Sequence, residues 1–254
     1  MPDISNSPST SVARRSPAQS AQRDPSAPAK VRARRLRASG AALVAAPMIF
    51  FLAEFTAAAA WTQPPYSYTY NYISNLGVRG PVEALNQYMY SPLAWVMNLG
   101  FFLFGIAVLV GVALLGGLAG WRRGVALILA ALVAVGAVLL AFFHGDGTVS
   151  ASGVDFHSLG ALASIAGGNI LVIVLGRLRR HVDLASRPAR AMVALGAFGL
   201  VSLVVFLALA DQGTNEHLGL VERCAVYPLL VGLICAGASI CRAQTGSGNR
   251  STRP

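Results

Sequence analysis

The chain has 254 residues, of which 55% are hydrophobic and only 12% are charged, whereas soluble domains usually carry about 25% charged residues. The hydrophobic residues gather in blocks of about 20, the length that crosses a bilayer as a helix. This composition excludes an ordinary soluble domain and indicates an integral membrane protein. The formal net charge of +10 does not indicate nucleic-acid binding, because basic loops orient membrane proteins and no nucleic-acid-binding motif accompanies the charge.

Residues 1–38 are rich in Ser, Pro, Ala and Arg and contain almost no large apolar side chains. Such a segment cannot bury a core, so it is predicted to be a disordered basic arm in the cytoplasm. The arm ends in a basic cluster, residues 30–37, directly before the first apolar block. This cluster is expected to be attracted to anionic lipid headgroups.

Six apolar blocks follow, and each is long enough to cross a bilayer once as a helix. They lack the period-2 alternation of membrane β-strands. The predicted fold is therefore all-α, a polytopic transmembrane bundle of six helices in one domain, residues 39–241, with a cytoplasmic tail at 242–254. The predicted helices span about residues 39–60, 93–116, 125–143, 157–175, 191–210 and 219–240.

Lysine and arginine are distributed unequally over the segments that connect these helices. Eighteen of the 20 lie in the arm, the tail and alternate connections, and the other two, Arg79 and Arg223, lie on the opposite side. Because positively charged loops stay in the cytoplasm, both termini are predicted to be cytoplasmic. The Ala- and Arg-rich composition is typical of a high-GC bacterium, which favours a multi-pass protein of the plasma (inner) membrane.

The first apolar block allows a second interpretation. Arg34-Arg35, the apolar stretch that follows and the alanines at 57–60 before Trp61 also fit an export signal with a cleavage site. A retained helix is favoured because a long arm precedes the block and the block is long enough to span. Cleavage would leave the orientation of the other five helices unchanged.

The longest connection, residues 62–92, is predicted to lie outside the cell. Tyrosines at every second position favour an extended stretch with one aromatic face, which either anchors the loop at the membrane interface or forms a wall for a lipid or sugar headgroup. Residues 81–90 could form a short interfacial helix, since Pro81 suits the first helical position. The tyrosines of this aromatic loop are Tyr66, Tyr68, Tyr70 and Tyr72.

Ionisable residues concentrate at the outer ends of the predicted helices, where hairpin geometry brings them to one depth. Such groups are costly in lipid unless they are paired or hydrated, so they are the best candidates for a functional site. This candidate polar cluster consists of Glu54, His144, Asp146, Asp155, His157, Asp211, His217, Glu222 and Arg223.

Imidazole and carboxylate groups together are ligands for zinc, and a bound zinc could activate water against a lipid headgroup. The predicted metal ligands are His144, His157 and His217. No metal-binding spacing such as HExxH is present. Simple hydration at the helix ends, a divalent metal site and a proton or substrate relay therefore remain alternative interpretations.

Arg223 lies near the start of the sixth predicted helix, where the helix dipole disfavours a cation. It therefore needs a partner, and Glu54 is the obvious one if the first and sixth helices are adjacent. A buried Glu54–Arg223 pair that locks the bundle is favoured over an Arg223 that grips a phosphate.

Three short segments together resemble a bacterial family, the domain of unknown function 998 (DUF998). They are Tyr72-Ile-Ser-Asn-Leu-Gly77, His157-Ser-Leu-Gly-Ala161, and Gly219-Leu-Val-Glu-Arg223 followed by Tyr227-Pro228. The resemblance covers about residues 39–241. It implies a six-helix inner-membrane protein and supplies no reaction.

Three functional hypotheses follow from these observations. In the first, the protein binds membrane lipid or a membrane partner through the outer polar and aromatic residues. In the second, it is a metal-dependent hydrolase of lipid headgroups, and in the third it transports a small solute or couples transport to protons. The sequence favours the first hypothesis, because no catalytic motif is present.

Overall fold

The computed structural model describes residues 27–151, 153–213 and 216–248. Within these residues, six helices are long and apolar enough to cross a membrane. The predicted all-α fold of six transmembrane helices is therefore confirmed. The helices are α1 (Ala27–Ala60), α2 (Ala94–Ala113), α3 (Gly120–Phe142), α4 (Phe156–Arg177), α5 (Ser186–Asp211) and α6 (Leu218–Gly248).

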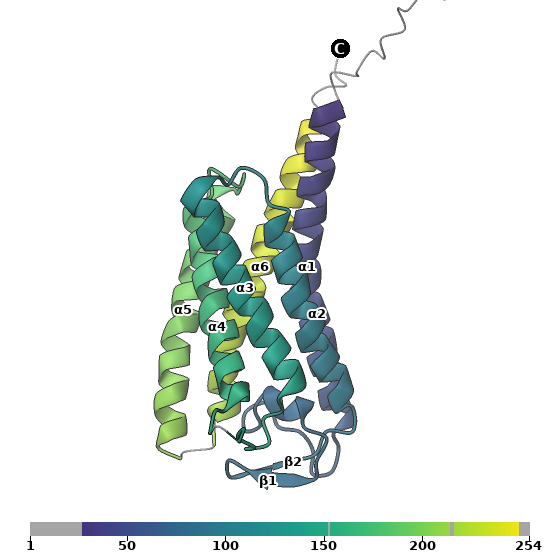
Figure 1. The fold of residues 1–254 in the computed structure, drawn as a ribbon, viewed down its shortest axis with the longest axis vertical. Coiled ribbons are helices and arrows are strands. Elements are labelled where there is room, and N and C mark those ends of the chain that lie inside the picture. The colour runs from purple at the N-terminus through teal and green to yellow at the C-terminus, as the bar shows by residue number, and fades with distance from the viewer. Residues whose placement is uncertain (1–26, 152, 214–215, 249–254) are drawn as a thin grey trace, which may run out of the picture.

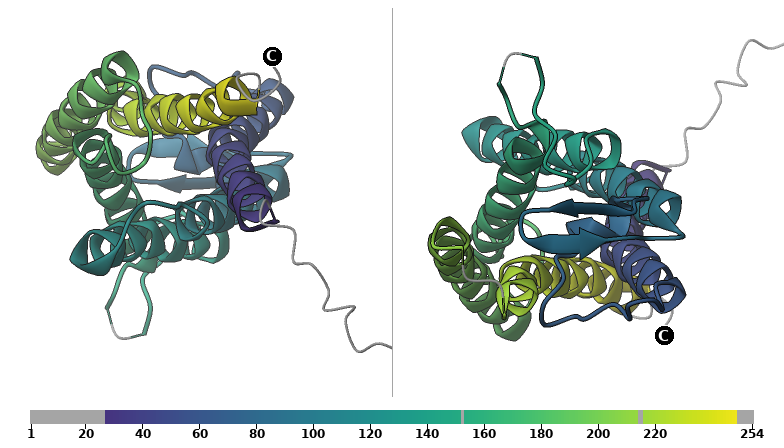
Figure 2. Two further views of the ribbon diagram at one scale, coloured as in Figure 1. Left: turned by 90° about the horizontal axis from the view of Figure 1, so that it is seen from above. Right: turned by 90° about the horizontal axis from the view of Figure 1, so that it is seen from below.

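The helices form a closed ring in which each one packs against its neighbours in sequence and α1 packs against α6 (Figure 2). Helix α4 also contacts α6, so α5 lies on the outside of that pair. The start of α1 and the end of α6 lie at the same end of the bundle (Figure 1). We call this the basic end, because most of the arginines lie there, and we call the opposite end, where residues 61–93 lie, the loop end.

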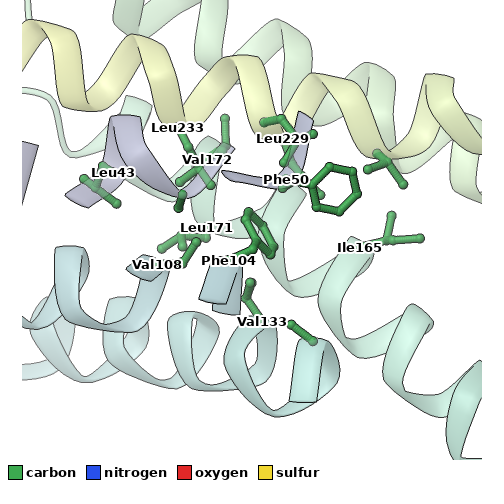
Figure 3. Packing of buried hydrophobic residues seen from close by; sticks show 14 of the residues in the cluster. Leu43, Phe50, Phe104, Val108, Val133, Ile165, Leu171, Val172, Leu229 and Leu233 are labelled. Atoms are coloured by element: carbon green, nitrogen blue, oxygen red, sulfur yellow. The ribbon is translucent and has the colours of Figure 1, made fainter. Parts of the chain in front are cut away.

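Buried apolar side chains from different helices meet along the axis of the bundle (Figure 3). Phe50 of α1 packs edge-on against Phe104 of α2, with ring centroids 5.5 Å apart. Helices α3 and α4 approach closely, since a Cβ atom on Gly136 would lie 2.5 Å from the carbonyl oxygen of Gly160. Large apolar side chains also cover the outer surface, such as Leu52, and this surface suits contact with lipid chains rather than with water.

Two helices extend beyond the predicted bounds at the basic end. Helix α1 begins at Ala27, so the predicted disorder does not hold for residues 27–38. Helix α6 continues to Gly248, into the predicted tail. Arginine and lysine are good helix formers, and α1 and α6 support each other there, because the guanidinium of Arg37 donates a hydrogen bond to the Gln244 carbonyl at 3.4 Å. Residues 1–26 of the predicted arm and 249–254 of the tail lie outside the described residues.

The loop end is closed by a short hairpin, so the predicted helix at 81–90 is wrong. Strands β1 (Val82–Ala84) and β2 (Gln87–Met89) pair antiparallel and lie across the ends of the helices (Figure 2). Gln87 and Met89 are buried while Tyr88 between them is exposed, which is the alternation of a strand with one covered face. The turn residues Leu85 and Asn86 have φ angles of 51° and 57°, and two left-handed residues are what a tight hairpin turn requires.

Candidate functional site

A buried ion pair joins the first and last helices near the loop end. Arg223 of α6 contacts the Oε1 atom of Glu54 in α1 through Nη2 at 3.0 Å and through Nε at 3.2 Å. The Glu54 side chain is fully buried, and the Arg223 side chain is 5% exposed. The predicted Glu54–Arg223 pair is thus confirmed. Because α1 and α6 are the two helices that close the ring, the pair holds the ring together.

The rest of the Arg223 guanidinium is bound by the loop that covers this end. Its Nη1 atom donates hydrogen bonds to three backbone carbonyls, those of Tyr68 at 2.8 Å, Asn71 at 3.0 Å and Gly219 at 2.9 Å. Its Nη2 atom also donates to the Tyr66 hydroxyl. All three guanidinium nitrogens therefore have partners inside the protein, which supports the structural lock rather than a grip on a phosphate.

The carboxylate of Glu54 has a second partner that the sequence did not single out for this role. The hydroxyl of Tyr227 donates a hydrogen bond to Glu54 Oε1 at 2.9 Å. Tyr227 follows Arg223 by four residues, so the two side chains lie on the same face of α6. This spacing is the signal in the sequence from which Tyr227 could have been found.

The aromatic loop folds inward, and the expected extended stretch with one aromatic face is wrong. Residues 68–70 form a turn, Tyr72 is only 8% exposed and Tyr68 is 41% exposed, so the tyrosines do not share one face. The Tyr66 hydroxyl donates to the Tyr72 carbonyl at 2.9 Å. Tyr70, in contrast, reaches the hairpin, where its hydroxyl donates to the Asn86 carbonyl at 2.8 Å. The loop folds inward because of Arg223, whose N–H groups need the backbone carbonyls that this conformation of the loop supplies.

Burial keeps the phenols of this loop neutral. Burial raises the pKa of Tyr66 far above its ordinary value, although the adjacent guanidinium of Arg223 opposes the shift. Burial, together with the Glu222 carboxylate, raises the pKa of Tyr72 to about 12. Both phenols thus remain hydrogen-bond donors at any physiological pH.

Glu222 sits beside the lock and faces a small cavity inside the bundle. Its Oε2 atom accepts a hydrogen bond from the backbone N–H of Ile73 at 2.6 Å. Glu222, Ser74 and Ser164 line a cavity of about 40 Å³ whose other walls are mainly apolar. A buried water needs roughly 10–15 Å³, so the cavity has room for only a few water molecules.

The remaining members of the polar cluster belong to two connections at the loop end. Around the connection from α3 to α4, His157 interacts electrostatically with Asp155, Asp146 and His144. Asp155 caps α4 by accepting a hydrogen bond from the Ser158 backbone N–H at 3.0 Å, and Asp146 accepts one from the Thr148 hydroxyl at 2.7 Å. The Nδ1 atom of His157 donates to the Phe143 carbonyl at 2.8 Å, since a carbonyl can only accept. Asp211 and His217 are exposed at the connection from α5 to α6, and His144 is exposed at the end of α3.

Within the part of the chain that the structure describes, no three His, Cys, Asp or Glu side chains lie close enough to hold one metal ion. The zinc site at His144, His157 and His217 stays a prediction. Mass spectrometry checks it by comparing the metal content of the purified protein with that of a variant in which all three histidines are alanine.

The structure brings His144 instead to a groove that sequence reasoning missed. The groove has a volume of about 390 Å³ and lies at the loop end, between the start of α2, the end of α3 and the segment before the hairpin. Its polar lining consists of Arg79, Asn98 and His144, and Trp95 forms an aromatic wall. Trp95 is 65% exposed in the first turn of α2, the level at which tryptophans meet the membrane interface. We call this the loop-end groove.

The comparison with known proteins supports the resemblance seen in the sequence. The family model described as a protein of unknown function, DUF998, matches residues 44–239. No curated protein and no solved structure is significantly similar to the chain.

Two of the three segments that carried the resemblance meet in the structure. The first, residues 72–77, contains the 3₁₀ turn η1 (Ser74–Gly77) and gives the Ile73 N–H to Glu222. The third, residues 219–223, packs tightly on the loop, because a Cβ atom on Gly219 would collide with the Asn71 carbonyl oxygen. Since the family model covers most of the chain, including these segments, the protein belongs to the family of unknown function DUF998.

Proposed function

We propose that this protein resides in the plasma membrane with both chain ends in the cytoplasm, and that it binds phospholipid headgroups at its loop end. The orientation rests on the 18 lysines and arginines of the arm, tail and alternate connections, against two on the other side. The loop end is then the outer face. The function rests on one observation, the composition of the loop-end groove.

The loop-end groove combines the groups that recognise a phospholipid headgroup. Arg79 is exposed and has no hydrogen bond or ion pair to another described residue. His144, on the same groove, is likewise exposed and has no such partner among the described residues. An arginine and an imidazole can both donate hydrogen bonds to phosphate oxygens. These donors therefore remain available to a ligand, in contrast to those of Arg223.

The position of the groove favours a lipid over a soluble ligand. Trp95 lies on its wall and on the outer surface of α2, where a tryptophan ring contacts both headgroups and acyl chains. A headgroup that enters from the bilayer would thus meet Trp95 on one side and Arg79 on the other. A soluble ligand would gain little from Trp95 at that depth.

The test measures how much phospholipid the purified protein retains. The wild-type protein in detergent is expected to co-purify with phospholipid that native mass spectrometry detects. The double variant Arg79→Gln/His144→Gln should bind phospholipid in the loop-end groove at least about tenfold more weakly, since hydrogen bonds to charged groups are worth about 1.5–3 kcal/mol each. At limiting lipid it should therefore retain fewer phospholipid molecules per protein than the wild type.

The control is Glu216→Gln/His217→Gln, which changes two exposed ionisable residues at the same end that do not line the groove. This control should retain as much lipid as the wild type. A wild-type protein that retains no lipid, or two double variants that lose it equally, would contradict the proposal. Capture of a membrane partner that depends on Arg79 without any lipid would also contradict it.

A further inference from the structure

A second groove lies at the basic end of the molecule, between the end of α4 and the start of α5. It has a volume of about 410 Å³. The end of α4 and the start of α5 lie at the opposite end of the bundle from the hairpin (Figure 1), so this groove is separate from the loop-end groove. Three arginines line it, Arg177, Arg179 and Arg190. We call this the basic-end groove.

The arginines of the basic-end groove are not used by the fold. Arg177, Arg179 and Arg190 form no side-chain hydrogen bond or ion pair with another described residue. Other arginines at this end do have partners. The guanidiniums of Arg35 and Arg123 each donate to the carbonyl of Ala113 at 3.2 Å, which satisfies the end of α2. The three groove arginines thus keep their donors for something outside the chain.

The other walls of the basic-end groove are apolar. Gly176 lets the two helices approach closely, because a Cβ atom there would lie 2.7 Å from the carbonyl oxygen of Ala189. From this point the groove continues along α5 past Val193, Ala194 and Ala197. The side chains of Ala194 and Ala197 are exposed, and this part of α5 belongs to a membrane-spanning helix. The apolar part of the groove therefore faces the bilayer.

We propose that the basic-end groove binds an anionic phospholipid, with its phosphate on Arg177, Arg179 and Arg190 and an acyl chain along Val193, Ala194 and Ala197. Guanidinium groups bind phosphate with two parallel hydrogen bonds, and basic pockets between helices at the cytoplasmic side are typical sites for anionic lipid headgroups. A free phosphate would use only the arginines and leave the apolar wall empty.

The charge of the surrounding segment favours an anionic lipid over a zwitterionic one. Residues 177–190 contain five arginines and a single acidic residue, Asp183. A phosphatidylcholine headgroup carries a choline cation, which the surrounding arginines would repel, so much of the attraction to its phosphate would be lost. Phosphatidylglycerol or cardiolipin carries no such cation.

The test compares the full-length protein in nanodiscs of different composition. Thermal unfolding is measured in phosphatidylcholine, in phosphatidylcholine containing phosphatidylglycerol, and in phosphatidylcholine with inorganic phosphate in the buffer. Phosphatidylglycerol is expected to raise the unfolding temperature, because a ligand that binds the folded state stabilises it. Inorganic phosphate at the same concentration is expected to leave it unchanged.

The variants separate a defined site from a diffuse basic surface. The double variant Arg177→Gln/Arg190→Gln should lose most of the gain from phosphatidylglycerol and bind this lipid at least about tenfold more weakly. The matched control Arg180→Gln/Arg187→Gln removes the same charge from the same region, residues 177–190, without touching the groove, and it should keep the gain.

Equal losses in the two double variants would show that only the net charge matters and would overturn the proposal. So would equal stabilisation by inorganic phosphate, which would leave no role for the acyl chain. The loop-end residues Arg79 and His144 stay intact in all these variants, so lipid bound there contributes equally to each measurement.

Discussion

Arg223 and Glu54 are charged side chains inside a region that offers little water. Removal of one partner leaves the other buried and uncompensated, and such losses typically cost about 3–5 kcal/mol. We expect Glu54→Gln to lower the free energy of unfolding by about this amount, as measured by denaturant titration in detergent micelles. Glutamine keeps an oxygen that can accept from Tyr227, so the loss reports mainly the charge.

Two controls make this prediction sharp. Glu83→Gln removes a carboxylate from the exposed face of the hairpin and should change the stability by less than about 0.5 kcal/mol. The double variant Glu54→Gln/Arg223→Met should lose clearly less free energy of unfolding than the two single variants together. The reason is that neither substituted side chain carries an unpaired charge. Additive losses would show that the pair is not a lock.

Asp155 predicts a dependence of stability on pH. Partial burial favours the neutral acid, but hydrogen bonds from the side chain and backbone of Ser158 favour the carboxylate and lower the pKa of Asp155 below its ordinary value of 3.8. A lowered pKa in the folded state means that the charged cap stabilises the protein above about pH 4 and stops doing so as the pH falls through the folded-state pKa.

The measurement compares the wild type with Asp155→Asn, which keeps a capping side chain but cannot ionise. The wild type should be the more stable of the two at neutral pH, and the difference should vanish in acid below the folded-state pKa. A difference that is constant over the whole range would show that the charge of Asp155 plays no part.

Helix packing depends on glycines at the points of closest approach. Gly136 of α3 faces the backbone of α4, where a Cβ atom would lie 2.5 Å from the Gly160 carbonyl oxygen and 2.7 Å from the Ser164 nitrogen. Because backbone atoms cannot move aside cheaply, Gly136→Ala should lower the free energy of unfolding by about 1–3 kcal/mol. Thermal unfolding followed by a tryptophan or thiol-reactive probe measures the change.

Gly124 supplies the control on the same helix, since a Cβ atom there would meet nothing within 4 Å. Gly124→Ala should leave the stability unchanged or raise it by up to about 1 kcal/mol, the difference in helix propensity. Equal effects of the two substitutions would mean that α3 and α4 are not packed as described.

The six helices could be predicted from sequence because each apolar block is a property of consecutive residues. The hairpin could not, since β1 and β2 have only three residues each and Pro81 suggested a helix. Tertiary contacts decide its position: the Gln87 side chain lies between the Asn75 side chain and the Tyr70 carbonyl. Such contacts leave no periodic pattern in the sequence.

The candidate site also has parts that could be predicted from the sequence and parts that could not. The Glu54–Arg223 pair was predictable, because a lone charge in a membrane requires a partner. The carbonyls of Tyr68 and Asn71 that complete the shell of Arg223 were not, since every residue has a carbonyl. Nor was the loop-end groove, because Arg79 and His144 come together only when the loop meets the end of α3.

Helix α1 begins and helix α6 ends at the basic end of the molecule (Figure 1). The distribution of arginine predicts that this end is cytoplasmic. Cysteine labelling tests the orientation in a variant in which Cys224, Cys235 and Cys241 are alanine. A membrane-impermeant maleimide should label Val149→Cys in intact cells. It should label Ala185→Cys only after the membrane is permeabilised. The reverse pattern would contradict the orientation.

The order in which the ribosome makes the chain gives the Glu54–Arg223 contact a further consequence. Glu54 precedes Arg223 by 169 residues, and translation adds about 5–20 residues per second, so α1 is finished roughly 10–30 s before its partner exists. During this interval Glu54 lies at membrane depth without Arg223. Every copy that stops before α6 keeps Glu54 unpaired, so an unpaired acidic side chain in the first helix is a feature of incomplete chains that finished ones lack.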